Sequence, residues 1–458
     1  MDLRDAGGGT ALLRVVQMLA LNEVTDRHQI QQCHDIIKVL TAAGADPNSA
    51  DRDGKTPTVV AMASDSKHLR SWGLTVGCYL GRYYMVHRRP VYRSATCHVY
   101  QCKDRLRNEE PVALKVVTNA AHLEAEITSR FADGEFLDSR YVMGFLRLHV
   151  PAEQQDEWKS KFNDMQRAWD RQEDIVAAEP SEQDEACTDT FVLVLPWGSA
   201  SLDQAMSMER VAAIDMDAIA IAARQIVECL GHMHEKGRIH GDLKRKNVMR
   251  KMYGNEVMWM LIDMDAAARI GENVSLKYSE CCIPPEYMQA LRPARTDGRP
   301  APGQPKITAE VSFDIWSLGV LLYELFSGMD LFQRDLNDDT IASEVDRCAL
   351  ANWREPSQQH LDMVLMEIHH REQCSTFRWM AARDLILWCL QGKPAWRPSS
   401  MDSILLHPFF AKEDMPLPYV PPHIDEIDVM LSYQSHQEAS MSRLRAFLRA
   451  MGLCTCDS

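Results

Sequence analysis

Apolar positions recur at two different periods along the 458 residues, and the change of period divides the chain into segments. Residues 1–73 carry them at helical spacing and predict a small all-α segment. Residues 78–411 form one long unit that begins with short β-forming runs, such as EPVALKVV at 110–117, and ends with long helical patterns. We therefore expect an α+β domain preceded by a helical segment.

The first segment contains one well-defined order of helix, loop, turn and helix, in residues 36–63. An apolar stripe at helical period opens it, formed by Ile36, Ile37, Val39 and Leu40. Gly44 follows where a helix needs a left-handed terminal residue, and Thr56 and Pro57 suit the N-cap and first position of the next helix. This order resembles an ankyrin repeat, and residues 9–19 resemble the start of a weaker earlier one. A plain helical extension is the alternative.

Three stretches differ in composition from the long unit. Residues 151–187 are mostly acidic and poor in apolar residues, which predicts a solvated surface insertion. Residues 412–425 form a proline-rich linker. Residues 426–458 predict a strand at 429–433 and then an amphipathic helix, which is half of a parallel α/β unit. This tail is similar to the first strand and helix of a TIR domain, and a simple strand–helix tail is the alternative.

Composition and charge exclude several classes of function. The net charge of −15 argues against nucleic acid as a partner, and no run of about 18 apolar residues predicts a membrane span. The thirteen cysteines include no CxxC pair, so we expect reduced thiols in a cytoplasmic protein. His232, His234 and His240 lack the spacing of a zinc site, and helix or loop histidines are the simpler interpretation.

A lysine ends one of the β-forming runs, VALK at 112–115. A lysine on the inner face of a strand is costly unless it meets an anion. Glu124 and Glu126 follow on a predicted helix, and either of them can pair with Lys115.

Four more polar residues follow in a pattern that suits phosphate chemistry. Asp242, Lys244 and Asn247 stand together in one loop, and a predicted strand delivers Asp263. Carboxylate and amide oxygens ligate magnesium, lysine binds phosphate, and a remaining aspartate can face a nucleophile. Together with Lys115, these residues predict a phosphate–magnesium site.

Six ordered motifs resemble the eukaryotic protein kinase family over about residues 80–411. They are VALK at 112–115, HGDLKRKNVM at 240–249, LIDMDAAARIG at 261–271, PPEY at 284–287, FDIWSLGVLLYELFSG at 313–328 and PAWRPSSMDSILLHPFF at 394–410. The resemblance implies a two-lobed fold with an N-lobe at 78–195 and a C-lobe at 198–411. It also implies ATP and Mg²⁺ as cofactors, protein substrates, and a pair between Glu286 and Arg397.

The resemblance further implies a role for each site residue. Asp242 would accept the proton of the substrate hydroxyl or orient that hydroxyl, and Lys244 would steady the transferred phosphate. Asn247 and Asp263 would ligate magnesium. Lys115 would hold the α- and β-phosphates, locked by Glu126, with Glu124 as the second choice. The adenine pocket and hinge would comprise Val91, Val99, Ala113, Leu195 as gatekeeper, Trp197 and Met249. Lys244 is typical of the serine/threonine branch.

Three departures from the family pattern bear on activity. The glycines that cradle phosphate are replaced by Tyr92, Ser94 and Cys97, and a side chain there obstructs the approach of backbone N–H groups to phosphate. Met264 and Asp265 replace the phenylalanine and glycine that follow the metal-binding aspartate. Gly241 replaces the arginine that grips an activation-loop phosphate in many kinases.

These observations leave two hypotheses of function and one rival family. We expect an active serine/threonine protein kinase in intracellular signalling, with flanking segments that bind signalling proteins. The alternative is a pseudokinase scaffold, favoured by the altered loop and turn. Small-molecule phosphotransferases also carry HGD, but they usually lack the PPE-type and later motifs found in this sequence. Because Gly241 cannot anchor phosphates on Ser275, Tyr278 or Ser279, we expect activity without activation-loop phosphorylation.

Overall fold

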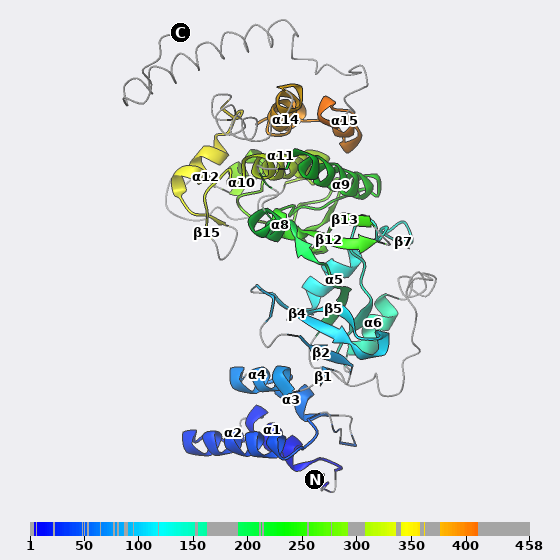
Figure 1. The fold of residues 1–458 in the computed structure, drawn as a ribbon, viewed down its shortest axis with the longest axis vertical. Coiled ribbons are helices and arrows are strands. Elements are labelled where there is room, and N and C mark those ends of the chain that lie inside the picture. The colour runs from blue at the N-terminus through cyan, green and yellow to red at the C-terminus, as the bar shows by residue number, and fades with distance from the viewer. Residues whose placement is uncertain are drawn as a thin grey trace, which may run out of the picture.

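The computed structural model places the predicted helical and strand-rich segments in one elongated molecule (Figure 1). It describes residues 4–410 except for 6, 22, 48, 50, 53–54, 65, 77, 80–81, 87–89, 95, 118, 152–153, 163–190, 210–211, 213–214, 254–255, 276, 292–306, 336–339, 358–360 and 362–375. The linker at 412–425 and the TIR-like segment at 426–458 therefore lie outside the described residues, and so does most of the acidic insertion.

The strand-rich lobe is built on an antiparallel sheet with the order β1-β2-β4-β5-β9-β8, and β3 pairs with β4. Its strands are β1 (Cys78–Tyr79), β2 (Tyr83–Met85), β3 (Tyr92–Arg93), β4 (Cys97–Asp104), β5 (Glu110–Val117), β8 (Arg147–His149) and β9 (Phe191–Pro196). One helix, α5 (Ala120–Thr128), packs on this sheet, and a small hairpin follows it, formed by β6 (Phe131–Ala132) and β7 (Glu135–Phe136).

Alternation along β5 decides which of its side chains face the site. Val112 and Leu114 point into one apolar cluster with tyrosines of the outer strands. Ala113 and Val117 point into a second cluster that includes Leu123 of α5. Since successive strand residues face opposite sides, Lys115 lies on the same face as Ala113 and Val117, toward α5.

The helix-rich lobe surrounds a central helix that is buried on all sides. This helix, α11 (Val311–Ser327), is buried from Phe313 to Phe326. The other helices are α8 (Leu202–Met208), α9 (Met216–Glu235), α10 (Pro285–Leu291), α12 (Glu344–Ala351), α14 (Thr376–Cys389) and α15 (Met401–Leu405). The strands are β10 (Ala200–Ser201), β11 (Arg238–Ile239), β12 (Val248–Tyr253), β13 (Glu256–Leu261), β14 (Ala268–Arg269), β15 (Arg334–Asp335) and β16 (Thr340–Ile341). This lobe also contains a three-stranded sheet with the order β10-β12-β13. In Figure 1, β12 and β13 lie on the side that faces the strand-rich lobe, and the loops of the candidate site adjoin their ends.

Two motifs of the helix-rich lobe meet in the buried pair that the sequence implied. Arg397 donates to both carboxylate oxygens of Glu286 at 2.8 Å, and its side chain has no exposed surface. Carbonyl oxygens of Gln391, Ser312 and Gly392 accept its remaining N–H groups, and its guanidinium lies over the ring of Trp316. The ion pair therefore connects α10 and α11 with the segment around Arg397, between α14 and α15.

The N-terminal segment consists of two helix pairs. Its helices are α1 (Ala11–Ala20), α2 (Arg27–Ala42), α3 (Pro57–Ala63) and α4 (Lys67–Val76), so the helical segment runs to Val76 rather than ending at 73. Gly44 adopts a φ of +84°, and α3 begins at Pro57, both as predicted. The predicted stripe is only half right. Ile37 is buried beside Cys33, whereas Ile36 and Val39 are exposed, because they lie on the opposite face of α2.

The insertion begins with a packed helix, which differs from the solvated stretch that its composition predicted. The helix α6 (Gln155–Lys161) buries Trp158 against Phe191 in the cluster beneath the sheet. Lys161 pairs with Glu124 of α5 at 2.7 Å. Trp158, with Phe162 packed against it, anchors this helix in an acidic sequence, although the average composition concealed it.

Replacing Glu286 with glutamine should destabilise the protein, because Arg397 would stay charged and buried without its carboxylate. We expect a loss of about 2–3 kcal/mol in the free energy of unfolding. The matched control is Glu209→Gln, which breaks a more exposed pair with Arg250 and should cost less than about 1 kcal/mol. Denaturant unfolding of both variants would measure the difference, and equal losses would contradict the role of the buried pair.

Candidate active site

Lys115 lies between two carboxylates, one from each lobe. Its Nζ donates to Glu126 Oε2 at 2.9 Å and to Asp263 Oδ1 at 2.5 Å. Burial alone would lower the pKa of Lys115, but the charges of Asp263 and Glu126 raise it well above its usual value. Glu124, the other sequence candidate, lies at the surface and pairs with Lys161 instead. The structure thus brings Lys115, Glu126 and Asp263 together and leaves Glu124 outside.

Arg130 is a second cation on Glu126, and the sequence reasoning missed it. Its guanidinium lies 2.9 Å from Glu126 Oε1, and its Nε donates to the carbonyl of Met143 at 2.9 Å. The residue is 2% exposed. Its position four residues after Glu126, one turn further along the chain, was the signal that could have found it. Glu126 is therefore held from both sides by positive charge.

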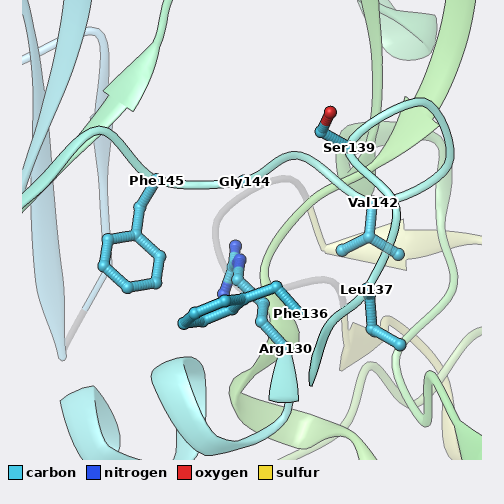
Figure 2. Close-up of a pocket in the computed structure, with 7 residues that line it drawn as sticks. All are labelled: Arg130, Phe136, Leu137, Ser139, Val142, Gly144 and Phe145. Carbon is cyan, nitrogen blue, oxygen red and sulfur yellow. The ribbon is translucent and has the colours of Figure 1, made fainter. Parts of the chain in front are cut away.

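The outer nitrogen of Arg130 faces a small cavity. Figure 2 shows the guanidinium beside the rings of Phe136 and Phe145. This nitrogen has no hydrogen-bond partner among the described residues, and the cavity measures about 30 Å³. A space of this size holds a water molecule or two, which can satisfy a buried donor. The cavity is too small for a nucleotide, so it does not compete with the site between the lobes.

The loop after β11 collects the three residues that were predicted to carry catalysis. Asn247 Nδ2 donates to the carbonyl of Asp242 at 2.9 Å and to its Oδ2 at 3.1 Å, and Lys244 Nζ lies 3.3 Å from the same Oδ2. Lys244 also donates to Ser279 Oγ at 2.7 Å. The other carboxylate oxygen of Asp242 is buried and has no hydrogen-bond partner among the described residues. One acceptor is thus fixed in place and open to a donor.

Asp314 of α11 holds the backbone of this loop. Its carboxylate accepts the N–H groups of His240 at 2.8 Å and Gly241 at 3.0 Å, and it lies 2.9 Å from His234 Nε2. Gly241 has a φ of +76°, which glycine adopts without strain, and a Cβ there would lie 2.6 Å from the carbonyl oxygen of Ala266. The buried aspartate therefore compensates for the unusual backbone ahead of Asp242.

Asp263 follows β13 in a left-handed conformation, with a φ of +63°. Burial alone would raise its pKa, but the charges of Lys115 and Lys277 hold it well below the usual range. Met264 is fully buried, as the apolar role inferred for it requires. Asp265 lies beside them with its side chain 5% exposed, and burial and then the charge of Asp263 raise its pKa to about 6.

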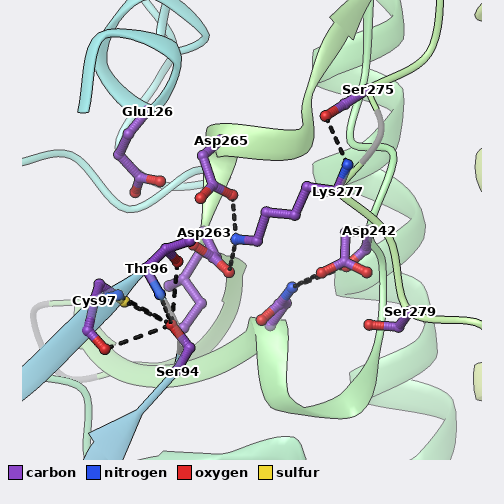
Figure 3. Close-up of polar contacts among 12 residues, drawn as sticks. Ser94, Thr96, Cys97, Glu126, Asp242, Asp263, Asp265, Ser275, Lys277 and Ser279 are labelled. Carbon is purple, nitrogen blue, oxygen red and sulfur yellow. Dashed lines mark hydrogen bonds and ion pairs between the residues drawn. The ribbon is translucent and has the colours of Figure 1, made fainter. Parts of the chain in front are cut away.

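Lys277 is the second residue that the sequence reasoning missed. Its Nζ donates to Asp263 Oδ2 at 3.0 Å and to Asp265 Oδ1 in a short hydrogen bond (Figure 3). Burial would lower its pKa, but Asp263 and Asp265 raise it above the usual value. No local pattern marks Lys277 in the sequence, because its partners precede it by more than ten residues in a segment without regular structure.

The oxygen atoms present suit a divalent cation. Oxygens of Glu126, Asp263 and Asp265 lie within 4.8 Å of one another, and Asn247 stands in the neighbouring loop. Carboxylate and amide oxygens are the ligands that Mg²⁺ prefers. The residues predicted from the sequence as metal ligands, Asn247 and Asp263, are thus chemically fit for that role.

The predicted adenine pocket falls on one apolar cluster between the lobes. Ala113 and Leu195 are cross-strand partners in that cluster, and three more of the predicted residues pack against it, namely Val99, Trp197 and Met249. Val91 is 48% exposed and lies outside the cluster, although its N–H bonds to the carbonyl of Val99. Five of the six predicted residues therefore gather at one place.

Comparisons with known proteins agree with this arrangement. A family model described as protein kinase domain matches residues 164–410, which is more than half of the chain. The match begins after Lys115 and Glu126, so it covers the helix-rich lobe and the site residues from Asp242 onward.

Curated relatives are similar to parts of the chain. Serine/threonine-protein kinase Kist from Homo sapiens is 28% identical over 222 residues, which cover 46% of this chain and 43% of Kist. Serine/threonine-protein kinase AtPK2/AtPK19 from Arabidopsis thaliana is 33% identical over 116 residues, 25% of this chain and 21% of that protein. Maternal embryonic leucine zipper kinase from Danio rerio is 29% identical over 147 residues, covering 32% and 20%. The chain thus matches less than half the length of these relatives.

Replacing Glu126 with glutamine should destabilise the protein far more than replacing Glu124, the other glutamate of α5. Glu126→Gln leaves Lys115 and Arg130 without their shared buried carboxylate and should cost about 3 kcal/mol in the free energy of unfolding. Glu124→Gln removes an exposed pair and should cost less than about 1 kcal/mol. Denaturant unfolding compares the two, and a Glu124 variant as unstable as the Glu126 variant would be evidence against this assignment.

Proposed function

This chain belongs to the protein kinase family, and from that premise we propose that it transfers the γ-phosphate of Mg-ATP to serine or threonine hydroxyls of protein substrates. The observation that supports the proposal most is the fixed group of Asp242, Lys244 and Asn247, set opposite Lys115 and Asp263. Every charged group that phosphoryl transfer requires is present in it. A cytoplasmic location and signalling partners for the flanking segments remain part of this proposal.

Each residue has a role in the proposed reaction. The free oxygen of Asp242 would accept the substrate hydroxyl proton or orient the hydroxyl for in-line attack. Lys244, held by Ser279, would stabilise charge on the transferred group. Lys115 would bind the α- and β-phosphates while Glu126 fixes its position. Magnesium would neutralise phosphate charge, held by Asn247 and Asp263.

The serine/threonine preference rests on the loop after β11. Lys244 lies beside Asp242 and donates to Ser279, so the loop and the segment before α10 are joined at the place where a substrate hydroxyl must enter. The relatives named above are serine/threonine kinases by their printed names. Both observations support this branch.

A pseudokinase scaffold is the second candidate. Two observations favour it. The hairpin that replaces the glycine loop is closed by its own hydrogen bonds around Ser94, and Lys277 lies at the carboxylates that a metal ion needs. The scaffold hypothesis requires that no phosphate be transferred, whereas the kinase hypothesis requires transfer that depends on Asp242.

Replacing Asp242 with asparagine should lower kcat by about 10²–10⁴-fold, because the amide cannot accept a proton. Transfer from radiolabelled Mg-ATP to a generic protein substrate would measure this loss. Asp217→Asn, an exposed change on α9, is the matched control and should keep full activity. Wild-type activity no higher than that of the Asp242 variant would sink the kinase proposal in favour of the scaffold.

Activity should survive removal of phosphate from the segment before α10. Gly241 offers no side chain to anchor such a phosphate, and Ser279 is 3% exposed and already bonded to Lys244. We expect phosphatase-treated protein to keep its kcat within about twofold, since no anchor is lost. Mass spectrometry would verify dephosphorylation at Ser275, Tyr278 and Ser279, and abolished activity would refute this expectation.

A further inference from the structure

The hairpin between β3 and β4 has already used the backbone donors that a phosphate would need. The Oγ of Ser94 accepts the N–H of Thr96 at 3.2 Å and the N–H of Cys97 at 3.1 Å. The N–H of Ser94 itself donates to the carbonyl of Cys97 at 2.9 Å. Among the described residues of this turn, these three N–H groups are thus engaged within the hairpin (Figure 3). A phosphate group bound beneath it must find its donors elsewhere.

Lys277 can supply the hydrogen-bond donors that the hairpin does not offer to a phosphate. Lys115 is the cross-strand partner of Val99, two residues after Cys97 in β4, and Asp263 contacts both Lys115 and Lys277. These contacts connect Lys277 to the strand that follows the hairpin. Lys277 is also reachable, since its side chain is 32% exposed, whereas that of Lys115 is 8% exposed. The cation is therefore linked to the hairpin strand through Asp263 and is partly exposed to solvent.

Two lysines flank one carboxylate. Lys115 contacts Oδ1 of Asp263 at 2.5 Å, and Lys277 contacts Oδ2 at 3.0 Å. The proposed function assigns Lys115 to phosphate, so Lys277 lies on the other side of the same carboxylate. An ammonium group has three N–H donors, and the contacts of Lys277 with Asp263 and Asp265 occupy two of them. The third donor can reach a ligand.

The carboxylate of Asp265 helps to hold Lys277 beside Asp263. Without Lys277, the buried carboxylates of Glu126, Asp263 and Asp265 would face only Lys115 and Arg130 within the described part of the cluster. The aspartate that replaces the usual glycine therefore recruits one more cation than the family pattern provides. Asp265 can hold Lys277 even when Asp263 engages a metal ion.

We propose that Lys277 is a second phosphate-binding lysine, which contacts the triphosphate of ATP in place of the hairpin N–H groups. The proposal rests on the kinase function proposed above and adds a binding residue to it. The ammonium supplies a point charge and a donor from the segment before α10. Phosphate would thereby be bound by the side chains of Lys115 and Lys277 instead of by backbone N–H groups of the hairpin.

The test compares ligands that differ only in phosphate. Isothermal titration of the full chain with adenosine and with ATP, both in the presence of Mg²⁺, gives the affinity that the phosphates add. In Lys277→Met the affinity for ATP should fall about tenfold, which corresponds to about 1.4 kcal/mol, while the affinity for adenosine stays within about twofold. Lys277→Arg should recover most of the loss because it restores the charge.

The matched control is Lys103→Met, which removes a surface lysine paired with Glu109 on the far end of β4 and should change neither affinity. Unchanged ATP affinity in Lys277→Met would overturn the proposal. So would a parallel loss for adenosine and ATP, which would mean that Lys277 only supports the fold. Wild-type protein that binds ATP no better than adenosine, or binds neither, would overturn it as well.

Failure of this inference can be told apart from failure of the kinase proposal. If ATP affinity depends on Lys277 but the wild type transfers no phosphate, Lys277 keeps its assigned role and the kinase proposal falls. If the wild type transfers phosphate and Lys277→Met binds ATP normally, the kinase proposal stands and the role of Lys277 falls.

Discussion

The site depends on keeping a buried group of charges in balance around Asp263. Three carboxylates lie close together in the described structure, and each is costly to bury unless a cation compensates it. Lys115, Arg130 and Lys277 provide that compensation from three different parts of the chain. Removing any one of the six groups would take away part of the charge compensation of its partners. The position of α5 and of the segment before α10 is therefore set by electrostatics as well as by packing.

Much of this arrangement could be predicted from the sequence, because it depends on motifs with short and fixed spacing. The loop with Asp242 and Asn247 and the strand that carries Lys115 follow from local patterns, whereas the pair of Glu286 with Arg397 was implied by the family resemblance. The all-α start of the chain and its order of helices also follow from the spacing of apolar residues. That spacing did not predict which face of α2 would be exposed. A stripe of apolar residues shows that a helix is present but does not decide which of them face a core.

The parts that escaped prediction are contacts that the sequence pattern around each residue does not mark. Lys277 meets its carboxylates across an irregular segment, so neither period nor spacing reveals it. Arg130 follows Glu126 at helical spacing, but only the burial around it shows that it points inward. Trp158 anchors a helix within a stretch whose average composition indicates solvent exposure. In each case one side chain decides the structure, and an average over the segment hides it.

The carboxylate of Asp314 has a consequence for the motions of the loop after β11. It accepts the amides of His240 and Gly241 from within a helix that is buried on every side. These amide hydrogens can exchange with solvent only when that helix separates from the loop, which amounts to opening the core of the lobe. The loop therefore belongs to the most protected unit of the protein rather than to its fluctuating surface. Slow deuterium uptake at these two amides would show that the geometry of the loop is built before any ligand arrives.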